Sequence, residues 1–167
     1  KIEDLAAYAL YEEVVYLLWN GKLPNAAELE NLRAAIAADA VVPDEVIALM
    51  KTFPKDANAM AILRTATSAL AFYDTDSERY DLDALRRKAI RLTGQVTTLS
   101  AAWMRIRKSL EPIAPRTDLN LSANFAYMMT GEEPSSSAVD AINAYMVLLT
   151  EHGRCAGAGA GSLQGCT

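Results

Sequence analysis

Cysteine and histidine are nearly absent from this sequence of 167 residues. It contains two cysteines, Cys155 and Cys166, and one histidine, His152. The chain before His152 therefore has no disulfide framework and no thiolate metal site. A zinc site built from these three residues would have no standard spacing and no identified fourth ligand. We expect no metal ion.

Long hydrophobic runs and clusters of basic residues are also missing. No apolar run approaches the roughly 20 residues that span a bilayer, and no signal sequence precedes the first helical pattern. The net charge of −5 disfavours a nucleic-acid surface. We interpret the nearest basic group, Arg105, Arg107 and Lys108, as the solvated end of a helix. These features predict a cytoplasmic protein that binds neither membranes nor nucleic acid.

Helical patterns fill most of the chain. Apolar residues make up 51% and charged residues 22% of the sequence, which suits one domain with a substantial core. No alternating strand pattern, internal repeat or interdomain linker precedes Gly153. We predict an all-α fold.

Capping residues and prolines divide the first third of the chain into helices. One is predicted over residues 2–8, and another over 12–19 that is apolar on all sides and should be buried. Asn25 caps a third helix, and Pro43 begins a fourth that Pro54 closes.

Two unusual helices are expected next. Asp56 is predicted to cap a helix from Ala57 to Tyr73 whose many small residues suit a crowded packing centre or a subunit interface. A 3-4 apolar rhythm then predicts a long helix from Leu82 to Leu110, with Gly94 as a candidate bend. A coiled coil is the less favoured alternative, because threonine and serine occupy positions that usually carry charges.

The stretch from Asp118 to Gly153 predicts two further helices. Gly131 suits a left-handed C-cap of the first, and the serines at 135–137 can cap the second. Apolar residues of the second recur at Val139, Ile142, Met146 and Leu149, and His152 lies at its C-terminal end.

Five blocks of sequence, in order, resemble citrate synthase of the shorter bacterial and archaeal type. They are Ile2–Leu5, Glu12–Pro24, Met60–Leu70, Ala123–Gly131 and Glu151–Gly153. The resemblance implies that residues 1–153 form part of the family's large helical domain. It also implies condensation of acetyl-CoA, or propionyl-CoA in some members, with oxaloacetate, no cofactor beyond the acyl-CoA co-substrate, and a homodimer.

Only one active-site residue carries over from the family. His152 matches the family histidine that contacts oxaloacetate, whereas its alternative role is a helix C-cap. Asn58-Ala59 replaces the usual His-Pro before Met60. The family's catalytic histidine and aspartate, its second substrate histidine and its substrate-binding arginines have no counterpart here, so no catalytic residue is assigned.

Residues 154–167 do not resemble the family. They hold four of the eight glycines and both cysteines, and cannot bury a core. A truncated or frame-shifted chain, an engineered linker and a divergent end are the alternatives. Gly157, Gly159 and Gly161 lack the Lys-Ser/Thr ending of a phosphate loop.

Two functional hypotheses follow. The first is a citrate synthase family chain that cannot complete the reaction alone, and the second is a non-catalytic helical module for dimerisation or packing. The acidic pairs Glu12-Glu13, Asp74/Asp76 and Glu132-Glu133 are interpreted as solvated or capping residues in either case.

Overall fold

The computed structural model describes residues 8–150, and every regular element in this range is a helix. The α-helices are α2 (Tyr11–Asn20), α3 (Ala26–Ala38), α4 (Asp44–Lys51), α5 (Ala59–Ala69), α6 (Leu82–Ile106), α7 (Leu121–Thr130) and α8 (Ser136–Leu149). A 3-10 turn, η1 (Leu70–Phe72), extends α5. The all-α prediction is confirmed for the described residues.

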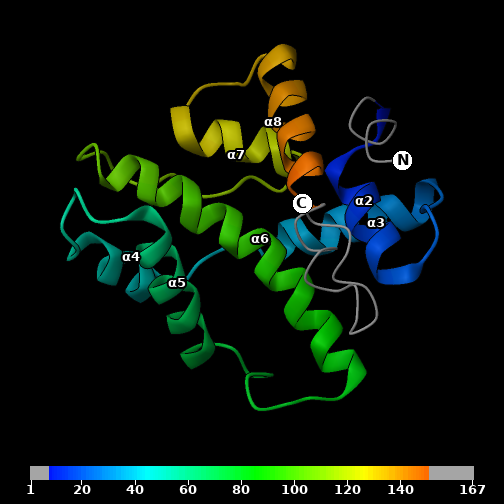
Figure 1. Ribbon diagram of the computed structural model, residues 1–167, viewed down its shortest axis with the longest axis horizontal. Coiled ribbons are helices and arrows are strands. Elements are labelled where there is room, and N and C mark those ends of the chain that lie inside the picture. Colours follow the sequence, from blue (N-terminus) through cyan, green and yellow to red (C-terminus); the bar gives the residue numbers. More distant parts are fainter. Residues whose placement is uncertain (1–7, 151–167) are drawn as a thin grey trace, which may run out of the picture.

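The long helix α6 is the element against which the others pack. It runs diagonally through the molecule, with α4 and α5 on one side, α2 and α3 near the other, and α7 and α8 beside its later turns (Figure 1). Its contacts reach α3, α4, α5 and α7, which excludes a simple two-helix coiled coil. The hydroxyls of Thr93, Thr97 and Ser100 donate hydrogen bonds to carbonyls one turn earlier in α6. Their hydrogen-bonding needs are therefore met without water or a partner helix.

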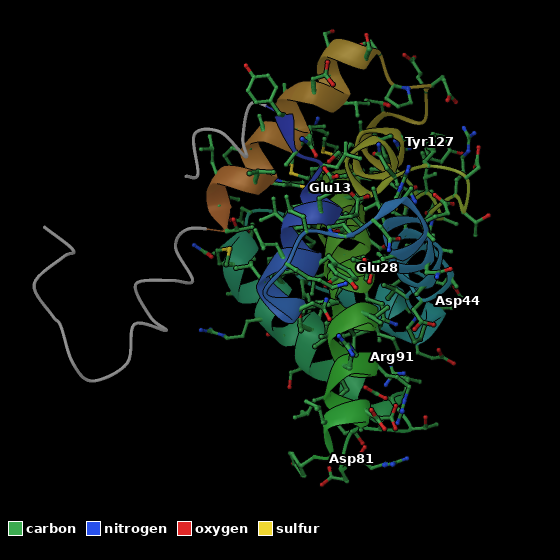
Figure 2. All side chains as sticks on the ribbon, turned by 90° about the vertical axis from the view of Figure 1, so that its right-hand side faces the viewer. Glu13, Glu28, Asp44, Asp81, Arg91 and Tyr127 are labelled. Carbon is green, nitrogen blue, oxygen red and sulfur yellow. The ribbon has the colours of Figure 1, made fainter. Side chains whose placement is uncertain are left out.

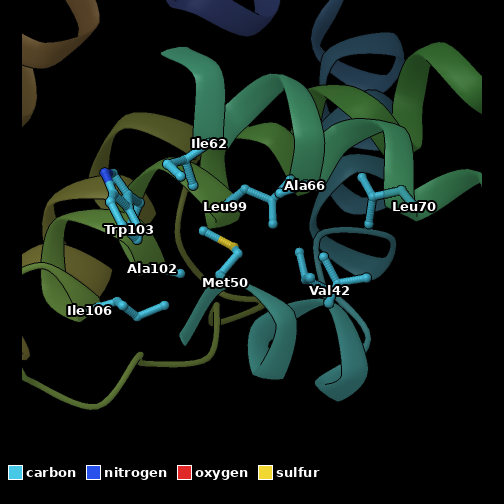
Figure 3. Close-up of a cluster of buried hydrophobic side chains, with 10 residues drawn as sticks. Val42, Met50, Ile62, Ala66, Leu70, Leu99, Ala102, Trp103 and Ile106 are labelled. Carbon is cyan, nitrogen blue, oxygen red and sulfur yellow. The ribbon is translucent and has the colours of Figure 1, made fainter. Parts of the chain in front are cut away.

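The main hydrophobic core lies between α4, α5 and α6. Its fully buried members include Met50, Ala66 and Leu99, with the Trp103 ring at one end (Figure 3). A second cluster joins α2, α3 and α7 through Val15, Ile36 and Leu121. The helix α6 contributes to both clusters, since Leu99 is buried in the first and Ile90 packs against the second.

Gly94 allows α3 and α6 to approach closely. A Cβ atom at this position would lie 2.8 Å from the Ile36 carbonyl oxygen and 2.9 Å from Ala40 Cα. One turn later, the Thr98 hydroxyl donates to the Ala40 carbonyl at 2.8 Å. Glycine at 94 is therefore required by backbone proximity, whatever its effect on the curvature of α6.

Most predicted helix ends are confirmed. Asn25 and Ser135 accept hydrogen bonds from the third residue of their helices, and Gly131 has φ 83° at the end of α7. Pro43 precedes the first residue of α4. Short-range capping chemistry determined these boundaries, so the sequence contained the required information.

Predictions for three helices, α2, α5 and α6, were wrong in part. The cap of α5 is Asn58 rather than Asp56, because the Asn58 side chain accepts from the Met60 and Ala61 amides. Regular α-helix ends at Ala69 in α5 and at Ile106 in α6, earlier than Tyr73 and Leu110. In α2 only part of the surface is buried, since Leu18 and Trp19 are exposed.

Candidate functional site

His152 lies outside the described residues, so its predicted contact with oxaloacetate stays a prediction. The described chain ends at Thr150, which forms the C-cap of α8. The Thr150 hydroxyl donates to the Val147 carbonyl at 2.6 Å and so satisfies one of the last carbonyls of the helix. The direction of α8 therefore determines where the chain leaves toward His152.

The position of α8 is held by one buried residue and by an asparagine. Val147 is fully buried, and the Ser122 hydroxyl lies 3.7 Å from the Met146 sulfur. The Asn143 side chain accepts from the Tyr11 amide at 2.8 Å and donates to the Ala9 carbonyl at 2.9 Å. The amide of Asn143 thus joins the last described helix to the first one.

An apolar groove lies between α6, α7 and α8. Its cavity measures about 400 Å³ and is lined by Val96, Thr97, Ser100, Phe125, Ala141, Ile142, Tyr145, Met146 and Leu149. The face of α8 that carries Ile142, Met146 and Leu149 borders this groove and is only partly buried, since Leu149 is 46% exposed. We call this cavity the α8 groove.

The α8 groove is chemically unsuited to a dicarboxylate. Among the lining residues that fall within 8–150 there is no lysine, arginine or histidine, and the hydroxyls of Thr97 and Ser100 already bond to helix carbonyls. Carboxylates are normally recognised by charge-assisted hydrogen bonds. The groove instead suits apolar side chains. Its lining extends along α8 as far as Leu149, the last residue of that helix.

A charged cluster fastens the segment between η1 and α6. Asp76 accepts two hydrogen bonds from Arg87, at 2.7 and 2.9 Å, and one from Arg91 at 3.0 Å. Arg91 also pairs with Asp74 and lies in the first half of α6, between Asp81 and α7 in Figure 2. The guanidinium of Arg87, and then that of Arg91, hold the pKa of Asp76 well below its ordinary value.

A second charged cluster fixes the connection from α6 to α7. Arg116 pairs with Asp118 and Glu133, and these carboxylates raise its pKa, with Asp118 the larger contributor. Its guanidinium lies 5.2 Å from the centre of the Tyr127 ring. The buried Asn124 side chain binds both the amide and the carbonyl of Arg116. The charged groups of this cluster and the Asn124 amide have protein partners, so we interpret the cluster as structural.

Two predicted acidic pairs contain buried members, which corrects their interpretation as solvated. Glu12 is 2% exposed and Asp76 is 6% exposed. Asp76 is buried because two arginines neutralise it, and Glu12 because it accepts from the Leu121 amide at the start of α7. Glu13 is a capping residue as expected, since it accepts from the Leu10 amide. The spacing of Arg87 and Arg91 on one helix face was a usable signal for Asp76, whereas Glu12 had none.

The described residues contain neither a metal-binding cluster nor a membrane-spanning helix. Across 8–150, no three His, Cys, Asp or Glu side chains gather closely enough to hold a metal ion. No helix in this range has the length and apolar character required to cross a bilayer.

The sequence matches a known family along nearly its full length. The model of "Citrate synthase, C-terminal domain" matches residues 1–166. Citrate synthase 2 of Bacillus subtilis is 44% identical over 152 residues, covering 90% of this chain and 41% of that protein. A 2-methylcitrate synthase of Mycobacterium tuberculosis is 38% identical over 152 residues, covering 91% and 38%.

Solved structures show the same fold. A citrate synthase of Pyrobaculum aerophilum superposes with a TM-score of 0.80 at 32% identity, covering 88% of this chain and 39% of that one. The citrate synthase of Thermoplasma acidophilum, in a ternary complex with carboxymethyl coenzyme A and oxaloacetate, gives 0.81 at 24% identity. The present chain spans about 40% of the length of these relatives.

Proposed function

This chain belongs to the citrate synthase family, and we propose that it forms part of an enzyme that joins an acyl-CoA to oxaloacetate. The main support is the match of the family model to residues 1–166, together with the fold shared with the Pyrobaculum enzyme. Relatives named citrate synthase and 2-methylcitrate synthase make acetyl-CoA and propionyl-CoA the two candidate substrates.

We assign His152 a binding role toward oxaloacetate. A hydrogen-bond-donating imidazole can recognise a carboxylate or a keto oxygen. Asn143 and Val147 hold the helix that precedes it, so α8 could present the ring in a defined direction. Because the described lining of the α8 groove carries no cationic side chain, we propose that further carboxylate-binding groups approach from outside this groove.

The chain by itself should not turn over substrate. Citrate formation requires a base that removes a methyl proton, a donor that stabilises the enolate, and groups that orient oxaloacetate. General acid-base groups contribute about 10²–10⁴-fold each. This sequence has one histidine, which is assigned to substrate binding, and it spans about 40% of the relatives' length. The missing groups would be supplied by further family sequence.

A coenzyme A release assay with acetyl-CoA and oxaloacetate tests this function. We expect no release above background from the purified chain, with or without His152→Ala. Co-expression with the part of the Bacillus relative outside the matched region should give turnover that His152→Ala reduces and the neighbouring Thr150→Ala leaves nearly unchanged. A folded but inactive complex would contradict the proposed enzyme, and turnover by the chain alone that depends on His152 would contradict its incompleteness.

Dimerisation through α5 is the second candidate role. The exposed side of α5 and η1 carries Arg64 and the small residues Thr65, Ser68 and Ala71 between the exposed apolar residues Met60 and Phe72. Small side chains allow two helices to approach closely, and the large apolar side chains that flank them can then bury apolar surface in the interface. We propose a homodimer across this face, which fits both an enzyme subunit and a non-catalytic module.

The proposed location is the cytoplasm. The absence of cysteine from residues 1–154 fits a reducing compartment. Fractionation of cells that produce the natural protein, followed by detection in the cytosolic or the membrane fraction, tests this location.

A further inference from the structure

The carboxylate of Glu12 is a buried acid that the proposed function does not use. Glu12 lies on α2 and is 2% exposed. Its Oε1 atom accepts from the Leu121 amide, the first residue of α7, at 2.8 Å. The partial positive charge of a helix N-terminus stabilises such a carboxylate, but only one of its two oxygens is used.

Glu12 lines a small cavity, and its second oxygen is unpartnered among residues 8–150. In the part of the chain that the structure describes, Oε2 is buried and has no hydrogen-bond partner. Glu12 lines a cavity of about 10 Å³ together with Arg33, Ala37, Asn120 and others from α3 and the start of α7. A cavity of roughly 10–15 Å³ accommodates one water molecule. Both the size and the polarity of this cavity suit a single bound water.

Arg33 supplies the complementary charge at the same cavity. The ion pair that it makes within residues 8–150 is with Glu30, at 3.8 Å, and the Glu30 side chain is 74% exposed. A contact of this length to an exposed carboxylate engages little of a guanidinium with five N–H donors. Arg33 therefore has donors available for a ligand in the cavity that also faces Glu12.

We propose that this cavity binds one structural water, which donates to Glu12 Oε2 and accepts from the Arg33 guanidinium. A bound anion is disfavoured by the neighbouring carboxylate. A calcium or magnesium ion would need at least six oxygen ligands, for which the cavity has no room. The water would link α2, α3 and α7, and the charge of Arg33 would stabilise the buried Glu12 carboxylate through it.

A crystal structure of the chain at about 1.8 Å resolution or better tests the water directly. We expect a density peak within hydrogen-bonding distance of both Glu12 Oε2 and an Arg33 nitrogen. An empty cavity, a peak that does not contact Glu12, or the Arg33 guanidinium bonded directly to Glu12 would each overturn the proposal.

A double-mutant cycle tests the charge coupling. Urea unfolding of Glu12→Gln, Arg33→Met and the double variant should show coupling of at least about threefold in the unfolding equilibrium constant. The matched cycle of Glu30→Gln with Arg33→Met should give a smaller factor, because that pair is exposed. Equal coupling in both cycles would overturn the link to Glu12. If Glu12→Gln does not fold, the crystal structure of the unmodified chain still shows whether the water is bound.

Discussion

The amide of Tyr11 donates a hydrogen bond to the side chain of Asn143 across 132 positions of sequence, at 2.8 Å. Tyr11 is the first residue of α2, where a helix has amide groups without internal partners. Asn143 also donates to the Ala9 carbonyl, so one side chain satisfies two backbone groups. The same residue thereby sets the position of α8 relative to the beginning of the described chain.

Replacing Asn143 should destabilise the fold. Asn143→Ala removes two hydrogen bonds to partly buried backbone groups, and we expect a loss of about 1–3 kcal/mol in the free energy of unfolding. Urea denaturation followed by circular dichroism measures it. Asn31→Ala, at an exposed position of α3, is the control and should be nearly neutral. Equal effects of the two variants would show that Asn143 does not join α8 to α2.

Gly94→Ala should be destabilising, although the same change usually favours a helix. In most helix interiors alanine is better than glycine by about 1 kcal/mol. Here the new methyl group would lie 2.8 Å from the Ile36 carbonyl oxygen, and overpacking of this kind costs about 1–3 kcal/mol. Thermal and urea unfolding of Gly94→Ala measure the net change in stability from these two opposing effects. An increase in stability would mean that α3 and α6 can separate at no cost.

The contribution of Asp76 to the stability of the fold should disappear in acid. Because its pKa is lower in the folded chain than in the unfolded one, Asp76 stabilises the fold fully above the unfolded value, near 3.9. This stability is lost as pH falls below that value and through the lower folded pKa. Asp76→Asn should therefore be clearly less stable than the parent at pH 7, and the difference should narrow at pH 3.

The pH series has an internal control. Asp118 also pairs with an arginine and its pKa is also lowered, but its side chain is 63% exposed. Asp118→Asn should change the urea midpoint less than Asp76→Asn at pH 7, because solvent screens exposed ion pairs. If the difference between Asp76→Asn and the parent is the same at pH 7 and pH 3, the ionised carboxylate is not what stabilises the segment before α6.

Local signals explain which parts of the fold were predictable. The caps at Asn25, Ser135 and Gly131 act on amides or carbonyls within four residues, so the sequence alone located them. Asn58 competed with Asp56 for one helix start, and only the φ and ψ angles of the structure decide between such neighbours. The cap position was therefore missed by two residues.

Long-range partners explain what was missed. Glu12 appeared to be a solvated acid because its partner amide, at Leu121, is 109 residues away in the sequence. The recurrence of apolar residues that includes Met146 in α8 could not reveal the groove beside it, because periodicity reports apolar character and not the presence of a covering element. His152 stood out in the sequence as the one histidine, whereas its role toward oxaloacetate follows only from the family resemblance and stays a prediction.

Self-association through α5 is the last prediction. The exposed side of this helix has small residues at Thr65 and Ser68, with Met60 and Phe72 at its ends, 71% and 88% exposed. We expect sedimentation velocity to show a dimer at micromolar concentration. Ser68→Arg should shift it to monomer, because it adds a second long charged side chain one turn after the exposed Arg64, and this new charge would be desolvated in the interface. Ser136→Arg, exposed at the start of α8, is the matched control and should leave the dimer intact. A parent chain that stays monomeric at high concentration would contradict self-association. A dimer that survives Ser68→Arg would place the interface elsewhere, with the α8 groove as the next surface to test.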